Sequence, residues 1–404
     1  MVRQQHWRLP EGVDELLPPA AWQLEMTRRR VLDVFRSWGF EYVDPPVIEY
    51  LDALLVGSGS DMDLQTLKVV DQRSGRLLGV RADMTSQAAR IDAHSLPADG
   101  VQRLCYSGSV VHANPTAVLD TRVPLKAGAE IFGTQSPAAD AEVIALLLDV
   151  LHTVGITAPV LVLGHVGIYN ELVGALDLPA EQERTLFSAV QRKSATDIAE
   201  LLGSAPGAER VARLPALMGR RDVLDEARRV LAVDAAAGSA KSQAEAALAG
   251  AIDSLEHLAD LVAERCPDVE LRFDLAELAG YGYHNGPVFS AYQAGSGSAV
   301  ARGGRYDGIG AAFGRARPAT GFDVSLKQLP LQVENTEPAV WAPWIDGEPA
   351  RRQALQACLQ RLRAEGEIVL AALSASDRPP ARCNRILTEA DGNWTVRPLK
   401  QEQF

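Results

Sequence analysis

The sequence predicts a mixed α/β (α+β) fold, in which helices flank a sheet that a helical segment interrupts. Strand-like patterns occur in the first part of the chain, up to about residue 178, and return from residue 269. Between them, residues 181–264 are rich in Ala, Leu, Glu and Arg and poor in aromatic residues, which favours helices. The two β-rich parts are therefore expected to share one sheet.

The length of 404 residues fits two or three domains. We expect residues 1–178 and 266–332 to form the sheet domain together. Residues 179–265 are expected to form the helical insertion, and residues 333–404 a small C-terminal α/β domain.

The first element is predicted from helical spacing. Residues 22–38 have Trp22, Met26, Val31, Leu32 and Phe35 largely at intervals of three and four, which is typical of an amphipathic helix. Gly39 is expected to end it.

The next elements are extended. Tyr42–Tyr50 has the sequence YVDPPVIEY, where adjacent prolines force extended backbone and favour an edge or boundary strand. Residues 67–83 form two apolar runs around Ser74-Gly75, which predicts a hairpin. An amphipathic helix over 140–154 and a buried strand over 159–169 follow.

The C-terminal part is predicted in the same way. Residues 355–373 have the pattern of a helix followed by a strand. Residues 384–399 have that of a hairpin that turns at Asp391-Gly392.

Composition limits the functional classes. The net charge of −12 and the pI of about 5.2 give no general attraction for a polyanion, so nucleic-acid binding is not expected. The four cysteines are isolated, which is typical of reduced thiols in a cytosolic protein. No apolar run has the length of a membrane span, and the N-terminus lacks the apolar core of a signal peptide. His112, His165 and His284 lack metal-ligand spacing, so no metal site is expected.

One motif points to an inherited site. Residues 301–329 have the sequence ARGGRYDGIGAAFGRARPATGFDVSLKQL, which has neither of the common glycine-rich phosphate-binding forms. GGRYDG followed by a Gly-Phe strand resembles the end of the catalytic domain of histidyl-tRNA synthetases, which are class II synthetases. The resemblance runs from about Leu9 to Leu329. It implies a six-stranded antiparallel sheet flanked by helices.

The segment RADMTSQAAR, residues 81–90, resembles the element of that family that holds the α-ammonium of the amino acid. Asp83 and Thr85 match its carboxylate and its hydroxyl, although Asp is one methylene shorter than the family's Glu. A carboxylate offsets the ammonium charge, and a hydroxyl adds an oriented acceptor. Alternatively, the two side chains only cap the helix that follows.

Further residues match the amino-acid pocket of the family. Glu130 matches the residue that contacts the imidazole of histidine, and Tyr283 keeps one aromatic of a Tyr-Tyr pair whose other member is His284 here. Lys126 replaces a glutamine and Gly282 an aspartate. The alternative for Glu130 is a structural ion pair with Lys126 or Arg122.

Arg305 and Tyr306 of the GGRYDG motif match residues that line the imidazole side of the pocket. The glycines of the motif are expected to allow a tight turn and close packing of strands.

The cations that would support adenylate formation are missing. The resemblance implies arginines at three positions that here hold Val111, Ala279 and Gln328, and Ala113 replaces a neighbouring carboxylate. One preorganised donor to a developing charge is worth roughly 10²–10³ in rate. Losing three should leave adenylation negligible, unless Lys126, Arg302 or Arg305 substitutes for them.

A paralogue of this kind, without catalysis but with an amino-acid pocket, resembles the regulatory subunits of ATP phosphoribosyltransferase. The tail also fits: residues 341–404 hold nine Lys/Arg against eight Asp/Glu, and they are too few for the anticodon-binding domain of a synthetase. The resemblance implies a cytosolic homodimer, a hetero-octamer with a short-form catalytic subunit, no cofactor, and feedback inhibition by free histidine.

Two alternatives stay open. The first is a synthetase-like ATP-dependent ligase acting on an amino acid, which needs cations that the sequence does not supply. The second is a tRNA mimic or sensor, against which the acidic charge and the near-neutral tail argue.

Overall fold

The computed structural model describes residues 8–56, 60–97, 99–115, 120–232, 239–278, 283–330 and 337–399. The chain divides into two compact units, residues 1–331 and 332–404. Among the described residues, no helix is both long enough and apolar enough to cross a membrane.

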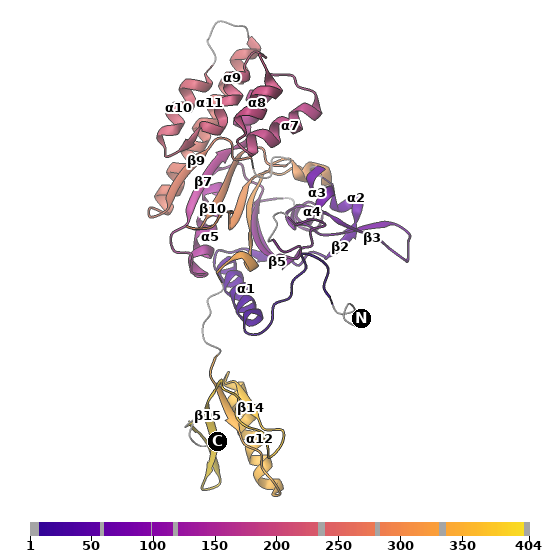
Figure 1. Ribbon diagram of the computed structural model, residues 1–404, viewed down its shortest axis with the longest axis vertical. Helices are drawn as coiled ribbons and strands as arrows, with labels where there is room; N and C mark the ends of the chain where they lie inside the picture. Colours follow the sequence, from indigo (N-terminus) through magenta and orange to yellow (C-terminus); the bar gives the residue numbers. More distant parts are fainter. Residues whose placement is uncertain are drawn as a thin grey trace. The chain divides into compact units, whose positions relative to one another are not determined.

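A large sheet organises the first unit (Figure 1). The described strands lie in the order β1 (Glu41–Tyr42), β5 (Gln102–Ser109), β6 (Leu125–Phe132), β12 (Ala319–Ser325), β11 (Ala301–Arg305), β10 (Pro287–Tyr292), β7 (Val160–His165), β9 (Glu270–Asp274) and β8 (Met218–Gly219). The six strands from β5 to β7 are antiparallel, whereas β1 and β9 pair in parallel with β5 and β7. Strands from both β-rich parts of the sequence therefore share one sheet, as predicted.

Helices cover one face of this sheet. These are α1 (Ala20–Ser37), α5 (Pro137–Thr153) and α11 (Ser239–Arg265) (Figure 1). Successive side chains of a strand point to opposite faces, so Ile131 and Phe322 enter the main apolar core on this side. The opposite face is covered at one end by α4 (Thr85–Ser95) and η2 (Ile309–Phe313), which pack with Leu104 and Tyr106 in a smaller core.

Two N-terminal predictions need correction. In α1 the buried side chains are Leu24, Val31 and Phe35, whereas Trp22 is 65% exposed because it lies beside that apolar stripe. The stretch 42–50 is not one strand. Around its prolines it divides into the end of β1 and β2 (Ile48–Tyr50), which belongs to another sheet.

This second sheet has the order β2-β4-β3, with β3 (Leu67–Val70) and β4 (Leu77–Val80) forming the predicted hairpin. Two short helices, α2 (Leu51–Leu54) and α3 (Ser60–Gln65), lie between β2 and β3 in the chain.

The buried strand predicted over 159–169 is shorter than expected. It ends at His165, whose Nδ1 accepts a hydrogen bond from the backbone N–H of Gly167 at 3.0 Å. A polar side chain that accepts from the second helical residue acts as an N-cap. Helix α6 (Val166–Gly174) therefore begins there.

Residues 179–265 contain α7 (Ala180–Gln191), α8 (Ala195–Leu202), α9 (Ala208–Arg213), η1 (Leu214–Ala216), α10 (Asp222–Leu231) and α11, with the two-residue strand β8 between η1 and α10. The α11 helix packs against α5, α6 and β7, which attaches this helical part to the sheet.

The second unit contains one described helix, α12 (Pro349–Ala364), and a sheet in the order β14 (Val369–Ala371), β13 (Ala339–Ala342), β15 (Cys383–Ala390) and β16 (Asn393–Pro398). The hairpin of β15 and β16 turns at Asp391-Gly392, as predicted. Both residues have positive φ, 52° and 76°, which a tight two-residue turn requires.

Candidate functional site

The candidate site lies on the face of the sheet that α4 covers. Side chains alternate along β6, so Lys126, Gly128 and Glu130 share this face. Glu130 lies opposite Gly321 of β12, and Gly128 lies opposite Tyr106 of β5. The register of three adjacent strands therefore brings these residues together.

Glu130 is the centre of a buried chain of hydrogen bonds. Its side chain is 1% exposed. Tyr106 Oη donates to its Oε1 at 2.8 Å, and Tyr306 Oη donates to its Oε2. Thr85 Oγ1, at the start of α4, lies 3.2 Å from Tyr106 Oη. The structure therefore connects Thr85, Glu130 and Tyr306, three of the residues identified from sequence.

Glycines make this arrangement possible. A Cβ atom at Gly128 would lie 2.6 Å from the ring of Tyr106, and one at Gly321 would overlap Oε2 of Glu130. Real Cβ contacts of this length are essentially absent because of atomic repulsion. Gly128 and Gly321 thus form a glycine floor, which leaves room for the Tyr106 ring and the Glu130 carboxyl close to the backbone of the sheet.

The motif glycines act similarly. Gly303 and Gly304 lie inside β11, where they allow close strand packing, whereas Gly308 lies in the turn before η2, so both expectations hold for different glycines of the motif. A Cβ atom at Gly304 would lie 3.0 Å from Nε2 of His284.

Burial dominates the protonation of Glu130. It raises the pKa from 4.5 to about 8, although the two tyrosine hydroxyls favour the charged form, and Asp83 and Asp323 raise it further. The carboxyl group is therefore largely protonated at neutral pH.

This pKa predicts a pH-dependent stability. The folded chain keeps the Glu130 proton between pH 4.5 and about 8 while the unfolded chain loses it, so the free energy of unfolding falls as pH rises through this window. We expect Glu130→Gln to remove this loss, which amounts to about 2–5 kcal/mol between pH 5 and 9. Chemical denaturation of both proteins at the two pH values measures it.

The control is Glu142→Gln, which removes a carboxylate of α5 that pairs with Arg103 at 2.9 Å outside the site. This variant should keep the pH dependence of the parent. If Glu130→Gln keeps it as well, the high pKa of Glu130 is wrong.

A half-buried ion pair lies beside Glu130. Lys126 Nζ is 2.9 Å from Oδ1 of Asp323, and the two side chains are 18% and 26% exposed. Burial opposes the charge of Lys126, but Asp323 and Asp83 together hold its pKa above the usual value. Lys126 therefore does not pair with Glu130, and neither does Arg122, which donates to the carbonyl oxygens of His112 and Glu11.

Asp83 lies just before α4. Its Oδ1 accepts a hydrogen bond from the backbone N–H of Met84 at 2.7 Å. Thr85 makes no side-chain cap of the helix, because its hydroxyl contacts Tyr106 instead. Neither Asp83 nor Thr85 therefore caps α4 with its side chain, because Met84 is the N-cap residue and not part of the first turn.

Aromatic side chains bound the other side. The rings of Tyr283 and His284 lie 4.2 Å apart between centroids, and the ring of Tyr306 lies 5.9 Å from Tyr283, edge to face. These rings provide an apolar wall next to the Glu130 carboxyl.

Arg305 is directed elsewhere, although the resemblance placed it in the pocket. It alternates with Gly304 along β11 and therefore points to the opposite, helix-covered face. Its guanidinium pairs with Asp140 of α5 at 2.9 Å and donates to the carbonyl oxygens of Thr134 and Ser136. Arg305 attaches β11 to α5.

The positions of the missing cations remain neutral where the structure describes them. Val111 occupies one, and Gln328 donates to Oδ1 of Asp120 at 3.3 Å in another. Ala279, like Gly282, lies outside the described residues. Of the cations considered as substitutes, Lys126 pairs with Asp323, Arg305 pairs with Asp140, and Arg302 lies opposite Asp323 in the register.

Sequence reasoning missed Tyr106 and Asp323. Both belong to the site only because of how β5, β6 and β12 align. The available signal was Gly128, since a glycine inside an apolar strand indicates that another group approaches closely.

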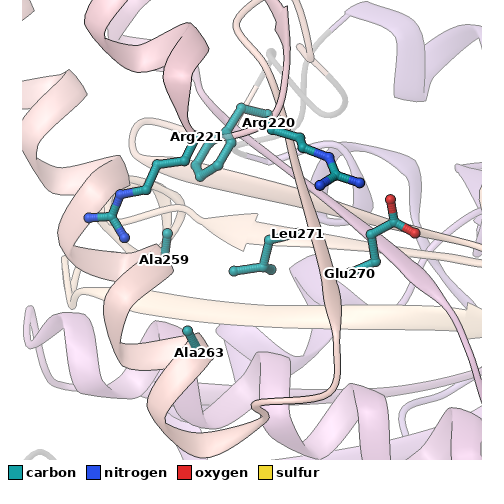
Figure 2. Close-up of a pocket in the computed structure, with 7 residues that line it drawn as sticks. Arg220, Arg221, Ala259, Ala263, Glu270 and Leu271 are labelled. Atoms are coloured by element: carbon teal, nitrogen blue, oxygen red, sulfur yellow. The ribbon is translucent and has the colours of Figure 1, made fainter.

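A hollow of about 330 Å³ lies away from these residues, between α11 and β9 (Figure 2). Arg221, at its rim, is already paired with Glu256 and Asp260. None of the residues that line this hollow was identified from sequence. They are Arg220, Arg221, Ala259, Ala263, Glu270, Leu271 and Phe273.

Comparison with known families agrees with this architecture. Residues 12–329 match the family model of histidyl-tRNA synthetase. Residues 337–397 match that of the C-terminal domain of the ATP phosphoribosyltransferase subunit HisZ.

The chain is similar over its length to proteins named ATP phosphoribosyltransferase regulatory subunit. The one from Pseudomonas paraeruginosa (strain DSM 24068 / PA7) is 46% identical, and the one from Azotobacter vinelandii (strain DJ / ATCC BAA-1303) is 47% identical. Each match covers 99% of this chain and 100% of the relative.

Solved structures show the same fold. An ATP phosphoribosyltransferase regulatory subunit/histidyl-tRNA synthetase from Bacillus halodurans C has a TM-score of 0.78 at 25% identity, covering 93% of this chain and 94% of that one. Histidyl-tRNA synthetase from Nostoc sp. PCC 7120 has a TM-score of 0.72 at 17% identity, covering 97% of both chains, and supports the fold alone.

Proposed function

The chain belongs to the family of ATP phosphoribosyltransferase regulatory subunits, and on that premise we propose that it is a non-catalytic partner of a short catalytic subunit at the first step of histidine biosynthesis. The observation that carries the proposal is the combination of a connected group of side chains that match the family's amino-acid pocket with neutral residues at the phosphate-binding positions. Glu130, Thr85 and Tyr306 form a connected group, whereas Val111 and Gln328 stand where the synthetase family places arginines.

The electrostatics of the site support a non-catalytic role. Asp83, Asp323 and Glu130 lie close enough to influence one another, and Lys126 is already neutralised by Asp323. A triphosphate would meet carboxylates where it needs cations, at a high cost in a partly desolvated place. ATP is therefore a poor ligand for this pocket.

Free histidine suits the pocket better. The protonated carboxyl of Glu130 can donate its O–H to an imidazole nitrogen, and it keeps acceptor positions for an imidazole N–H beyond the two that the tyrosines use. Asp83 and Thr85 lie at the α4 end for the ammonium group, and Tyr283 and Tyr306 form the aromatic wall. We propose that histidine binds here and inhibits the partner, which requires different affinities for two states of the assembly.

Self-association is part of the proposal. Ile48, 54% exposed, and the exposed side chains of Tyr42, Val47 and Tyr50 form an apolar stretch that one subunit leaves uncovered. We propose that a second copy covers it in a dimer.

The experiment that tests the partnership is co-purification of the whole chain with a short catalytic subunit, with the mass measured by light scattering. The proposal predicts a defined complex that contains a dimer of this chain. A monomer that does not join the catalytic subunit would contradict it.

An assay of ATP–pyrophosphate exchange distinguishes a non-catalytic subunit from the alternative, an ATP-dependent ligase. We expect no saturable exchange by the purified chain with histidine or any other amino acid, because one lost donor already costs roughly 10²–10³ in rate. An active histidyl-tRNA synthetase is the positive control. Saturable exchange above background would favour the ligase.

A further inference from the structure

We propose that Lys126 and Asp323 together form a seat for the zwitterionic head group of the bound amino acid, in which the ligand ammonium lies between Asp83 and Asp323 and its carboxylate lies on Lys126. The proposal rests on the proposed function, because it concerns the same pocket. Asp323 was not among the residues expected from sequence, and Lys126 stands where the resemblance places a glutamine.

The backbone places this pair inside the site. Asp323 lies opposite Gly128 on β6 and opposite Arg302 on β11, and Lys126 lies opposite Ser325 on β12. Alternation puts all of these side chains on the face that holds Glu130. Asp323 is therefore two residues along β12 from Gly321, the partner of Glu130, a separation that suits a small amino acid. Lys126 is four residues along β6 from Glu130, and its long side chain reaches back to Asp323.

The charges are accessible and unlike in sign. Lys126 and Asp323 keep 18% and 26% of their side-chain surface exposed, whereas Glu130 is sealed. Asp83 lies near enough to raise the pKa of Lys126. One end of the site thus offers two carboxylates, the ammonium group of Lys126 and the nearby guanidinium of Arg302.

This arrangement complements a zwitterion. An α-amino acid brings one ammonium group with three donors and one carboxylate, and it can replace one protein ion pair with two ligand ion pairs. A dianionic phosphate could contact Lys126 and Arg302, but both cations lie beside Asp323, and the carboxylates of Asp83 and Asp323 would repel the phosphate. The neutral ring of histidine then extends over the glycine floor toward Glu130.

The hydroxyl of Ser325 also supports a ligand carboxylate beside Lys126. The Oγ atom of Ser325, opposite Lys126, is buried and has no hydrogen-bond partner among the residues that the structure describes. A buried hydroxyl without a partner costs free energy, which a ligand carboxylate beside Lys126 would recover.

The test removes charged groups from the ligand as well as from the protein. Calorimetry on the full chain, in complex with its catalytic subunit, measures the binding of histidine, histamine and imidazole propionate. Histamine lacks the carboxylate and imidazole propionate lacks the ammonium group. We expect Asp323→Asn to weaken histidine about tenfold or more and to leave imidazole propionate nearly unchanged. Lys126→Met should weaken histidine similarly and leave histamine nearly unchanged.

Asp274→Asn is the matched control, since it removes the carboxylate of a comparable half-buried pair with Lys193 away from the site. It should bind all three ligands like the parent. Thermal denaturation of each variant checks folding. If a variant is unfolded, the binding of histamine and imidazole propionate to the parent still tests the proposal. Each of these truncated ligands should bind the parent at least tenfold more weakly than histidine does.

The outcomes separate the two proposals. If histidine does not bind the parent complex, the effector role of the pocket is wrong. If it binds the parent, and the variants and truncated ligands show no such loss, the effector role stands and the zwitterion seat is overturned.

Discussion

Replacing Glu130 with alanine is expected to weaken the binding of free histidine by about 5- to 150-fold, because a buried polar group that loses its hydrogen-bond partner costs about 1–3 kcal/mol. The carboxyl is the polar group at the closed end of the pocket, and Tyr106 and Tyr306 hold it in place. Without it, an imidazole N–H buried there has no acceptor on β6. The inhibitory concentration of histidine should rise in the same proportion, while turnover of the assembly without histidine stays nearly unchanged.

Calorimetry and inhibition assays on the reconstituted complex measure the two quantities. Asp83→Ala should act in the same direction at the ammonium end. Glu142→Ala, outside the site, is the control and should behave like the parent. If Glu130→Ala and Asp83→Ala both bind and respond to histidine like the parent, the effector site lies elsewhere.

Replacing Gly321 with alanine is expected to lower the free energy of unfolding by about 1–3 kcal/mol and to weaken histidine binding as well. The new Cβ would overlap the Glu130 carboxyl and lie 2.6 Å from the carbonyl oxygen of Ala129. Relief by backbone movement is costly because β12 is hydrogen-bonded to β6 and β11 along its length. The carboxyl must therefore move and break its contacts with the tyrosines.

Urea denaturation and calorimetry measure these changes. Gly250→Ala is the matched control, because Gly250 lies in α11 with no atom near its added Cβ, and alanine favours a helix. The double variant with Glu130→Ala gives a sharper test. Once the carboxyl is gone, alanine at 321 should cost less than it does in the parent. Equal costs in both backgrounds would show that Gly321 does not act through Glu130.

The elements that local patterns determine were predicted well. The hairpin of β3 and β4, the turn at Asp391-Gly392 and the sharing of one sheet by both β-rich parts follow from periodicity and turn residues. The limits of single elements were less certain. His165 ends a strand because its ring caps a helix, and an apolar run carries no mark of that change.

The site was harder to predict because its residues come together through pairing between strands. Arg305 and Tyr306 are adjacent in the chain, yet they contact Asp140 of α5 and Glu130 of β6 respectively. Tyr106 and Asp323 contribute through the register of β5, β6 and β12, which no local pattern determines. A motif identifies the residues of a strand, but only the pairing register between strands determines which face of the sheet they lie on and which neighbours they have.

The central claim is that this chain regulates a catalytic subunit through an inherited amino-acid pocket. The most direct measurement is the ATP phosphoribosyltransferase turnover of a short catalytic subunit, titrated with the parent chain and with Glu130→Ala, in the absence and presence of histidine. The account predicts that turnover depends saturably on either chain, that histidine inhibits the complex with the parent, and that the variant complex needs about 5- to 150-fold more histidine. Turnover that is independent of the chain, or equal inhibition of both complexes, would contradict it.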